Sequence, residues 1–332
     1  MATEVSLTVV KENTTETVSY IQPLVSYAVM DMFLIVNDFA LGCSISLLGV
    51  FTNTANIIVY YKMGLSESSN INFLALSVTD FFVSIITFFM KFMYNPVLRE
   101  LSTGPITTIV STSLSPASLC AVGGSAMMTA LISTERCLCV VFPLKVKTFL
   151  TPRRVLYLVF TIVAYMVAFL LVFFIDIGAP FTEHIEKQGF YFFYLYAVPS
   201  ATCFFIVVIT TSFLVVRLRK NSKWRKEISS QSERSSDKEN KLVKTIIAVC
   251  TIFIVCFFPN VLNLFVQIIH PSYRHLDPYL GSLILIMFTI SGLFHSISSS
   301  INIFFYYRMS SKFKRVFTET FFCTKKNQKA KR

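Results

Sequence analysis

Seven long apolar stretches, separated by short polar segments, make up most of this chain. They cover residues 34–61, 70–93, 106–140, 155–176, 190–219, 240–269 and 279–307. Each is long enough to cross a bilayer, because a membrane helix needs about 20 mainly apolar residues. Barrel strands are far shorter, and only helices and closed barrels satisfy their backbone groups in lipid. The pattern therefore predicts an all-α membrane protein, a seven-helix transmembrane bundle within residues 34–307.

Residues 308–332, after the seventh stretch, have an apolar pattern of their own. Phe313, Val316, Phe317 and Phe321 recur at spacings of three and four, and basic residues fill the opposite face. This spacing favours a short amphipathic helix on the membrane surface over a frayed, solvated tail. Cys323 follows directly and is a candidate for palmitoylation. A basic tail ends the chain.

The distribution of charge gives the orientation in the membrane. The chain is 14% charged, whereas a soluble domain carries roughly a quarter charged residues. The net charge of +12 would suit nucleic acid, but all but five of the 30 Lys and Arg residues lie in one set of loops and in the C-terminal tail. The exceptions are Lys11, Lys91, Arg99, Lys187 and Arg274. The positive-inside rule then predicts a cytoplasmic C-terminus and an N-terminus outside.

Three expectations follow from this orientation. Residues 1–33 form an extracellular segment, and Asn13 opens a glycosylation sequon within it. The basic cytoplasmic face contacts anionic membrane lipid and not nucleic acid. The eight Cys residues fall in predicted spans or on the cytoplasmic side, where thiols stay reduced, so we expect no extracellular disulfide.

Asp80 lies in the middle of the second stretch, where a carboxylate is costly unless polar groups or a cation face it. Two readings remain open from the residues alone. A sodium ion could bind beside Asp80, or a protonated Asp80 could hydrogen-bond to its neighbours. The candidates for its partners are polar residues of the first, third and seventh stretches, namely Asn53, Ser125, Ser298, Ser299 and Asn302.

The third stretch ends in Glu135 and Arg136, on the predicted cytoplasmic side. Glu135 can pair with Arg136 locally, and Glu239 at the start of the sixth stretch offers a second acidic partner. An Arg with two competing partners can join helices in one state and release them in another. The alternative is that Arg136 is an ordinary charged residue at the end of the helix, with a side chain that extends towards solvent. In the sixth stretch, Pro259 predicts a kink.

Together these residues resemble the signature set of the rhodopsin-like G-protein-coupled receptors. The resemblance covers about residues 34–322 and is closest to divergent invertebrate chemosensory and peptide-receptor branches. The matching positions, in family order, are Asn53, Asp80, Glu135-Arg136-Cys137, Pro143-Leu144, Pro199, Cys256-Phe257-Phe258-Pro259, Asn302-Ile303-Phe304-Phe305-Tyr306 and Phe313.

The resemblance implies a role for each of these positions. Arg136 would be the switch arginine and Glu239 its partner in the inactive state. Asp80, Ser125 and Asn302 would form a sodium pocket, with Na⁺ as an allosteric ion and no other cofactor. In the sixth helix the hinge under the ligand would be formed by Phe253, Phe257 and Pro259, and Tyr306 would swing inward on activation.

Several positions depart from the family pattern. Cys137 replaces the usual Tyr, Phe257 the usual Trp and Ile303 the usual Pro. Ser111 stands where the family carries the Cys of its outer disulfide, and residues 177–189 contain no Cys. A rigid, disulfide-bonded lid over the pocket is therefore not expected.

By the same resemblance, the ligand lies in the outer half of the bundle. Ser118 occupies the position of the acid in amine receptors, and Ser296 that of the retinal lysine in opsins, which argues against both ligand types. Lys91 could meet an anionic ligand, but an outward, snorkelling orientation is the favoured reading. His295 is more often a core histidine than a ligand contact. The pocket candidates are Lys91, Tyr94, Ser118, Val122, Tyr191, Asn260, Leu264, Gly292 and His295.

We therefore expect a multi-pass plasma-membrane receptor that couples an extracellular peptide or small molecule to a heterotrimeric G protein. The sequence offers no nucleophile–base set, phosphate loop or metal-ligand motif, so we expect neither an enzyme nor a metal site. The alternative is a seven-helix transporter or ligand-gated channel. That class usually needs several intramembrane charges, and Asp80 is the one deep acidic residue identified in the sequence. A receptor that binds ligand without coupling is a third reading, which Cys137 and Ile303 keep open.

Overall fold

The computed structural model describes residues 4–11, 14–93, 105–142, 150–175, 187, 189–227, 233–269 and 278–322. For residues 4–11, 14–21, 105–113, 221–227, 233–242 and 309, only the backbone is described. Three predicted modification and pocket residues, Asn13, Tyr94 and Cys323, lie outside the described residues.

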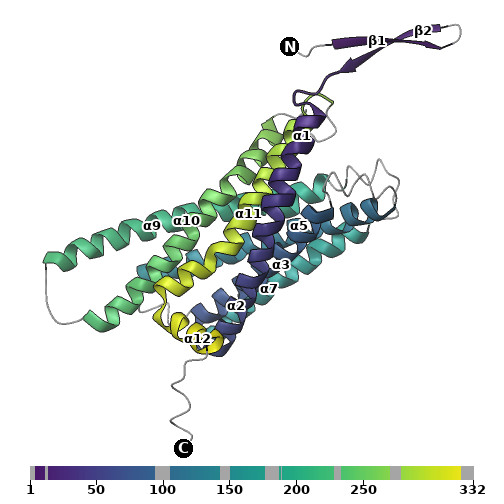
Figure 1. The fold of residues 1–332 in the computed structure, drawn as a ribbon. Coiled ribbons are helices and arrows are strands. Elements are labelled where there is room, and N and C mark those ends of the chain that lie inside the picture. The colour runs from purple at the N-terminus through teal and green to yellow at the C-terminus, as the bar shows by residue number, and fades with distance from the viewer. Residues whose placement is uncertain are drawn as a thin grey trace, which may run out of the picture.

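Among the described residues, seven helices are long and apolar enough to span a membrane, and they form the bundle, which confirms the predicted all-α fold (Figure 1). The first span consists of α1, the π-helix η1 and α2 in direct succession, and the fifth consists of η2 followed by α9. In chain order the helices are α1 Tyr27–Leu34, η1 Ile35–Gly42, α2 Cys43–Met63, α3 Ser68–Met93, α5 Pro105–Val141, α7 Pro152–Ile175, η2 Phe192–Ala197, α9 Val198–Glu227, α10 Glu233–Ile269, α11 Gly281–Met309 and α12 Ser311–Phe321.

The N-terminal part of the chain differs from the prediction in two ways. An antiparallel hairpin of β1 Glu4–Lys11 and β2 Thr14–Ile21 precedes the bundle, in a segment where no strand was predicted. The first helix begins at Tyr27 and not at residue 34, and Ser26 caps it by accepting a hydrogen bond from the Val29 N–H at 3.4 Å. Acidic residues interrupt the apolar pattern in this first part, so hydropathy alone places the start of the span too late.

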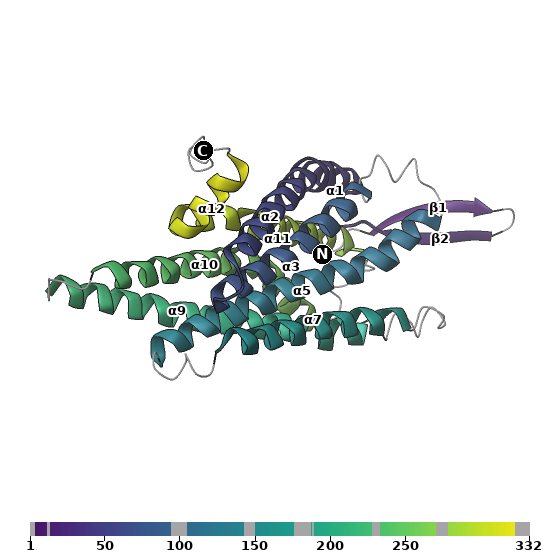
Figure 2. The same cartoon turned by 90° about the horizontal axis from the view of Figure 1, so that it is seen from below.

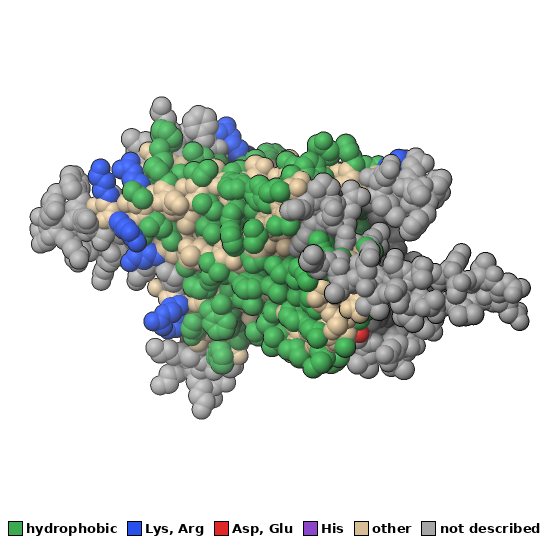
Figure 3. Space-filling model, turned by 90° about the horizontal axis from the view of Figure 1, so that it is seen from above, with side chains coloured by type: hydrophobic (Ala, Val, Ile, Leu, Met, Phe, Trp, Pro, Cys, Tyr) green, Lys and Arg blue, Asp and Glu red, His purple; other side chains and the backbone are tan. Residues whose placement is uncertain are grey.

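The outer surface of the bundle is apolar, as lipid requires. Figure 3 shows hydrophobic side chains across the middle of one face, with most of the visible Lys and Arg side chains towards one end. The helix α7 has the least buried span of the seven, and it exposes Tyr157, Phe160 and Leu171 by 59–70% of their surface. In water such a face would be a liability, but in a bilayer it is the surface that contacts acyl chains.

Helix packing places α3 near the centre of the polar sites described below. It contacts α2 on one side and α5 on the other, and it also touches α11 and η1 (Figures 1 and 2). The helix α10 packs between α9 and α11. Residues from the first, second, third and seventh spans therefore meet in the interior.

The predicted short helix after the seventh span is also confirmed, as α12. Ser310 caps it by accepting a hydrogen bond from the Phe313 N–H at 3.2 Å. Phe313 is fully buried, and its ring lies 5.2 Å from that of Tyr60 and 5.7 Å from that of Tyr306, between ring centroids. An apolar anchor thus holds α12 against α2 and α11.

Candidate functional site

Asp80 connects three helices in the middle of the bundle. Its side chain is almost completely buried. Ser125 of α5 donates a hydrogen bond to Asp80 Oδ1 at 2.6 Å, and Asn302 of α11 donates to Oδ2 at 2.8 Å. Each carboxylate oxygen therefore receives a donor from a different neighbouring helix, which meets the cost of burying the group.

A second set of polar contacts extends this network to α2. Asn53 donates a hydrogen bond to the carbonyl of Ser299 at 2.8 Å. The hydroxyl oxygens of Ser299 and Ser84 are 3.4 Å apart, and Ser84 in turn donates to the Asp80 carbonyl at 2.8 Å. Asp80 is thus part of a network that spans α2, α3, α5 and α11.

A small cavity lies beside this network. Its volume, counted as the space open to the centre of a water molecule, is about 20 Å³. This is room for a single water molecule. The predicted ion-site serines share this cavity with residues predicted for the hinge and the ligand pocket. Its lining is Val83, Val122, Ser125, Phe253, Cys256, Phe257, His295, Ser298 and Ser299.

Aromatic contacts connect the cavity to α10. The rings of Phe253 and Phe257 stack at 4.7 Å between centroids, and Phe257 lies 4.8 Å from the ring of His295. Pro259 lies inside α10, two residues after Phe257. His295 Nδ1 contacts the Ser291 carbonyl oxygen at 2.7 Å, whereas its buried Nε2 has no hydrogen-bond partner in the described part of the chain. His295 is therefore only half satisfied as a core histidine.

Glu135 and Arg136 lie at the opposite end of α5 from the ligand candidates. Glu135 Oε1 accepts from the Ser68 hydroxyl at 2.7 Å and contacts Arg136 Nη2 at 3.3 Å. Asn72 donates to Glu135 Oε2, and Arg136 Nη2 donates to Ser69. The start of α3 thus holds both members of the pair. Arg136 is only 12% exposed, which fits the paired reading better than an end charge in solvent.

Two further switch candidates can be placed. Tyr306 is buried, with its ring 5.0 Å from that of Phe73 and 5.3 Å from that of Tyr60. Within the described residues, its hydroxyl has no hydrogen-bond partner, which is an unfavourable state for a buried group. Glu239 lies in α10 where only the backbone is described, so its pairing with Arg136 stays a prediction.

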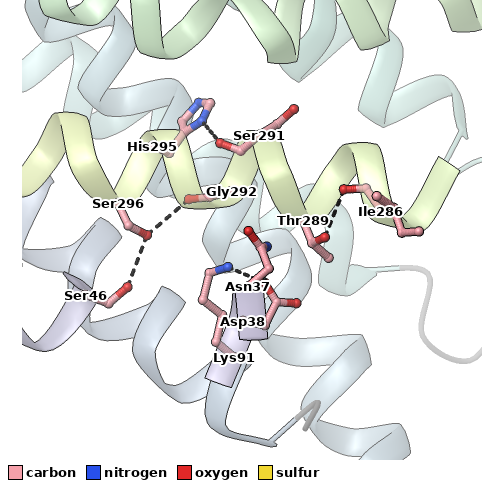
Figure 4. Close-up of polar contacts among 10 residues, drawn as sticks. All are labelled: Asn37, Asp38, Ser46, Lys91, Ile286, Thr289, Ser291, Gly292, His295 and Ser296. Atoms are coloured by element: carbon pink, nitrogen blue, oxygen red, sulfur yellow. Dashed lines mark hydrogen bonds and ion pairs between the residues drawn. The ribbon is translucent and has the colours of Figure 1, made fainter. Parts of the chain in front are cut away.

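Lys91 has a different environment from the one predicted. Its Nζ lies 2.5 Å from Asp38 Oδ1 of η1, and Asn37 donates to the same oxygen at 3.0 Å (Figure 4). The side chains of Lys91 and Asp38 are only 7% and 10% exposed. The outward, snorkelling orientation is therefore wrong, because an acid of the first span holds the ammonium inside. Asp80 is likewise not the one deep acid of the bundle.

The remaining pocket candidates are distributed over several contacts. Val122 and His295 line the same cavity as Phe257, and Gly292 lies beside Lys91. Asn260 accepts a hydrogen bond from the Tyr196 hydroxyl at 3.4 Å, and its buried amide nitrogen is without a partner among the described residues. Of the three other candidates, Leu264 is buried, and Ser118 and Tyr191 are half-buried.

Some residues of these sites were not found from the sequence. Asp38 and Asn37 lie close to the predicted start of the first span, where acids and amides are common. Ser68 is the first residue of α3 and Asn72 lies one turn further on, so both resemble ordinary polar residues of a helix end. A search for polar residues that recur at helical spacing and face a charged residue of a neighbouring span could have identified Asn72.

Comparison with known proteins agrees with this geometry. The family model of the 7 transmembrane receptor (rhodopsin family) matches residues 54–306. The match contains Asp80, Glu135, Arg136, Pro259 and Asn302, and it ends at Tyr306. No curated protein sequence matches the chain.

The contact between Asn72 and Glu135 generates a prediction about stability. Asn72→Ala removes a donor from a buried carboxylate, which costs about 1–3 kcal/mol in a protein interior. We expect a lower Tm for the purified protein in lipid nanodiscs. Thr54→Ala is the control, because the exposed Thr54 hydroxyl bonds only to the Val50 carbonyl of its own helix. Equal Tm values for the Asn72 and Thr54 variants would contradict the contact.

Proposed function

The chain belongs to the rhodopsin family of seven-transmembrane receptors, and we propose that it passes the binding of an extracellular ligand to a heterotrimeric G protein. It is a multi-pass protein of the plasma membrane. The proposed orientation has the N-terminus outside, because the Lys and Arg residues gather at the ends that would be cytoplasmic. The proposed ligand is a peptide or a chemosensory small molecule.

The observation that carries this proposal is the Arg136 cluster. Arg136 is a partly buried cation at one end of the bundle, and hydroxyl and carboxylate oxygens from α3 and α5 hold it. Exposed ion pairs contribute only about 0–1 kcal/mol, whereas contacts of a partly buried Arg contribute more and break only at a cost. Such a cluster is suited to hold a resting state that another interaction can overcome.

The cavity lined by Phe257 is the proposed connection between the ligand site and the Arg136 cluster. A ligand in the outer half would change the packing of Phe257 and His295, which share this cavity with Ser125 and Ser299. A different position of α10 would follow, and its inner end would move away from α5. Ligand binding favours this state only as far as the ligand binds it more tightly than the resting state. The opened cleft would present Arg136 to the G protein.

Arg136→Ala tests the proposed switch. We expect it to reduce agonist-dependent nucleotide exchange on the G protein by at least tenfold at an unchanged surface level, which corresponds to about 1.4 kcal/mol. The reason is that the variant lacks the group that the opened cleft would present to the G protein. Exchange is measured with purified G protein and receptor-bearing membranes. Arg153→Ala is the matched control, because it removes one exposed positive charge at the start of α7. Full coupling by the Arg136 variant would refute the assignment.

We further propose that Na⁺ binds beside Asp80 as an allosteric ion. The donor set fits, since a carboxylate and several hydroxyl oxygens are hard ligands of the kind that hard cations prefer. Asp80 and Ser125 would hold the ion, with Ser298, Ser299 and Asn302 around it. A bound ion would supply positive charge against the buried carboxylate and so favour the resting packing.

Sodium dependence of unfolding tests this site. A ligand that binds only the folded state raises its stability, so Tm should be higher in Na⁺ than in an equal concentration of N-methylglucamine. Asp80→Asn keeps the shape of the side chain but removes the charge, and it should abolish the difference. A Tm of the wild-type protein that does not respond to Na⁺ would instead favour the protonated, hydrogen-bonded Asp80.

The alternative of a transporter or channel gains one observation, a buried acid that the sequence analysis did not identify, Asp38. The Lys91–Asp38 pair adds two intramembrane charges to Asp80. However, the two charges pair with each other at 2.5 Å, and Asp80 is bonded separately to Ser125 and Asn302. Paired charges at separate levels are typical of helix–helix contacts, whereas an ion path needs charges that face a common route.

A further inference from the structure

The environment of Lys91 has the features of a built anion site. Lys91 lies near the end of α3, at the opposite end from the Arg136 cluster. Its side chain lies close to two glycines of neighbouring helices, Gly42 of η1 and Gly292 of α11. A Cβ at position 42 would lie 2.4 Å from Lys91 Cδ, so a larger residue there would displace the lysine side chain from this position.

The occupant of this site is Asp38. Lys91 Nζ and the Asn37 amide both contact Asp38 Oδ1, at 2.5 Å and 3.0 Å. The π-helical turn of η1 contains Asn37, Asp38 and Gly42, so one irregular turn supplies the anion, its supporting amide and the space for the lysine. Such turns inside α-helices often mark functional sites.

The pairing has a consequence for any ligand that carries an acid. A buried ammonium needs an anion, and within the described residues Asp38 is the anion that contacts Lys91. A ligand carboxylate that took Lys91 would leave Asp38 buried with only the Asn37 amide, and an unpaired buried charge is strongly unfavourable. The pair as it stands has no net charge.

We propose that Asp38 determines the charge class of the ligand. It serves as the built-in counter-anion of Lys91. The outer pocket therefore selects ligands that carry no acidic group to pair with this lysine. The inference rests on the proposed receptor function, whose ligand it describes. Removal of the Asp38 carboxylate should turn the same place into a binding site for a small carboxylate.

Chemical rescue tests this inference with acetate as the probe. Asp38→Ala leaves Lys91 unpaired and a space the size of the lost side chain. Its Tm in nanodiscs should be well below that of the wild-type protein in sodium chloride. Replacement of chloride by acetate at equal ionic strength should raise it towards the wild-type value. Acetamide, which has the same shape without the charge, should have no effect on it.

Two controls locate the effect at Lys91. Acetate should leave the Tm of the wild-type protein unchanged, because Asp38 occupies the site. Acetate should also have no effect on the Tm of the double variant Asp38→Ala/Lys91→Met, which has no ammonium to neutralise. If Asp38→Ala folds only when it is prepared in acetate, loss of its folded state on removal of acetate is the predicted result.

Each other outcome overturns the inference. An equal rise in the Tm of the wild-type protein in acetate would mean that Lys91 remains available to acids. An equal rise in the Tm of the double variant would place the effect elsewhere. No rise in Tm, or no folding of Asp38→Ala in acetate, would mean that a free carboxylate cannot take the place of Asp38 beside Lys91. Because these measurements need no G protein, they can fail while the coupling assay with Arg136→Ala succeeds, and the reverse.

Discussion

The cost of a charged group inside a bilayer is the constraint on which this structure depends. Such a group needs a partner within the bundle, since lipid offers none. The helix α3 meets the constraint at three levels. Asn72 near its start contacts Glu135, Asp80 in its middle receives donors from α5 and α11, and Lys91 near its end contacts Asp38 of η1. We therefore regard α3 as the element that positions the first, third and seventh spans.

The contacts of α10 around the cavity are of another kind. At the level of Phe257 they are aromatic, with Phe253, Phe204 and His295 as neighbours. Stacked rings are less directional than charge-assisted hydrogen bonds, so they allow one helix to shift against another with a smaller loss. A bundle held by polar clusters along α3 and by aromatic contacts of α10 at the cavity can change the position of α10 at this level while the other helices keep theirs. This contrast is the physical basis of the proposed receptor mechanism.

The sequence predicts the spans well because hydropathy is a local property of each segment. It also identified Asp80 together with Ser125 and Asn302, since deep polar residues in apolar helices are few and need one another. The partner of Lys91 was not predictable in this way. Which side of a helix faces which neighbour depends on the rotation of each helix in the bundle, and the π-helical turn of η1 changes that rotation locally. Asp38 also lies near the predicted helix end, where an acid needs no special explanation.

A double-mutant cycle on Lys91 and Asp38 tests most directly whether buried charges are paired across these helices. Four proteins are compared by thermal unfolding in lipid nanodiscs, namely the wild type, Lys91→Met, Asp38→Leu and the double variant. Loss of one partner of a buried pair costs about 3–5 kcal/mol, whereas replacement of both by apolar residues is often nearly neutral. We predict a low Tm for each single variant and a Tm near the wild-type value for the double variant. Losses that simply add would mean that the two residues do not interact, which would contradict the central claim.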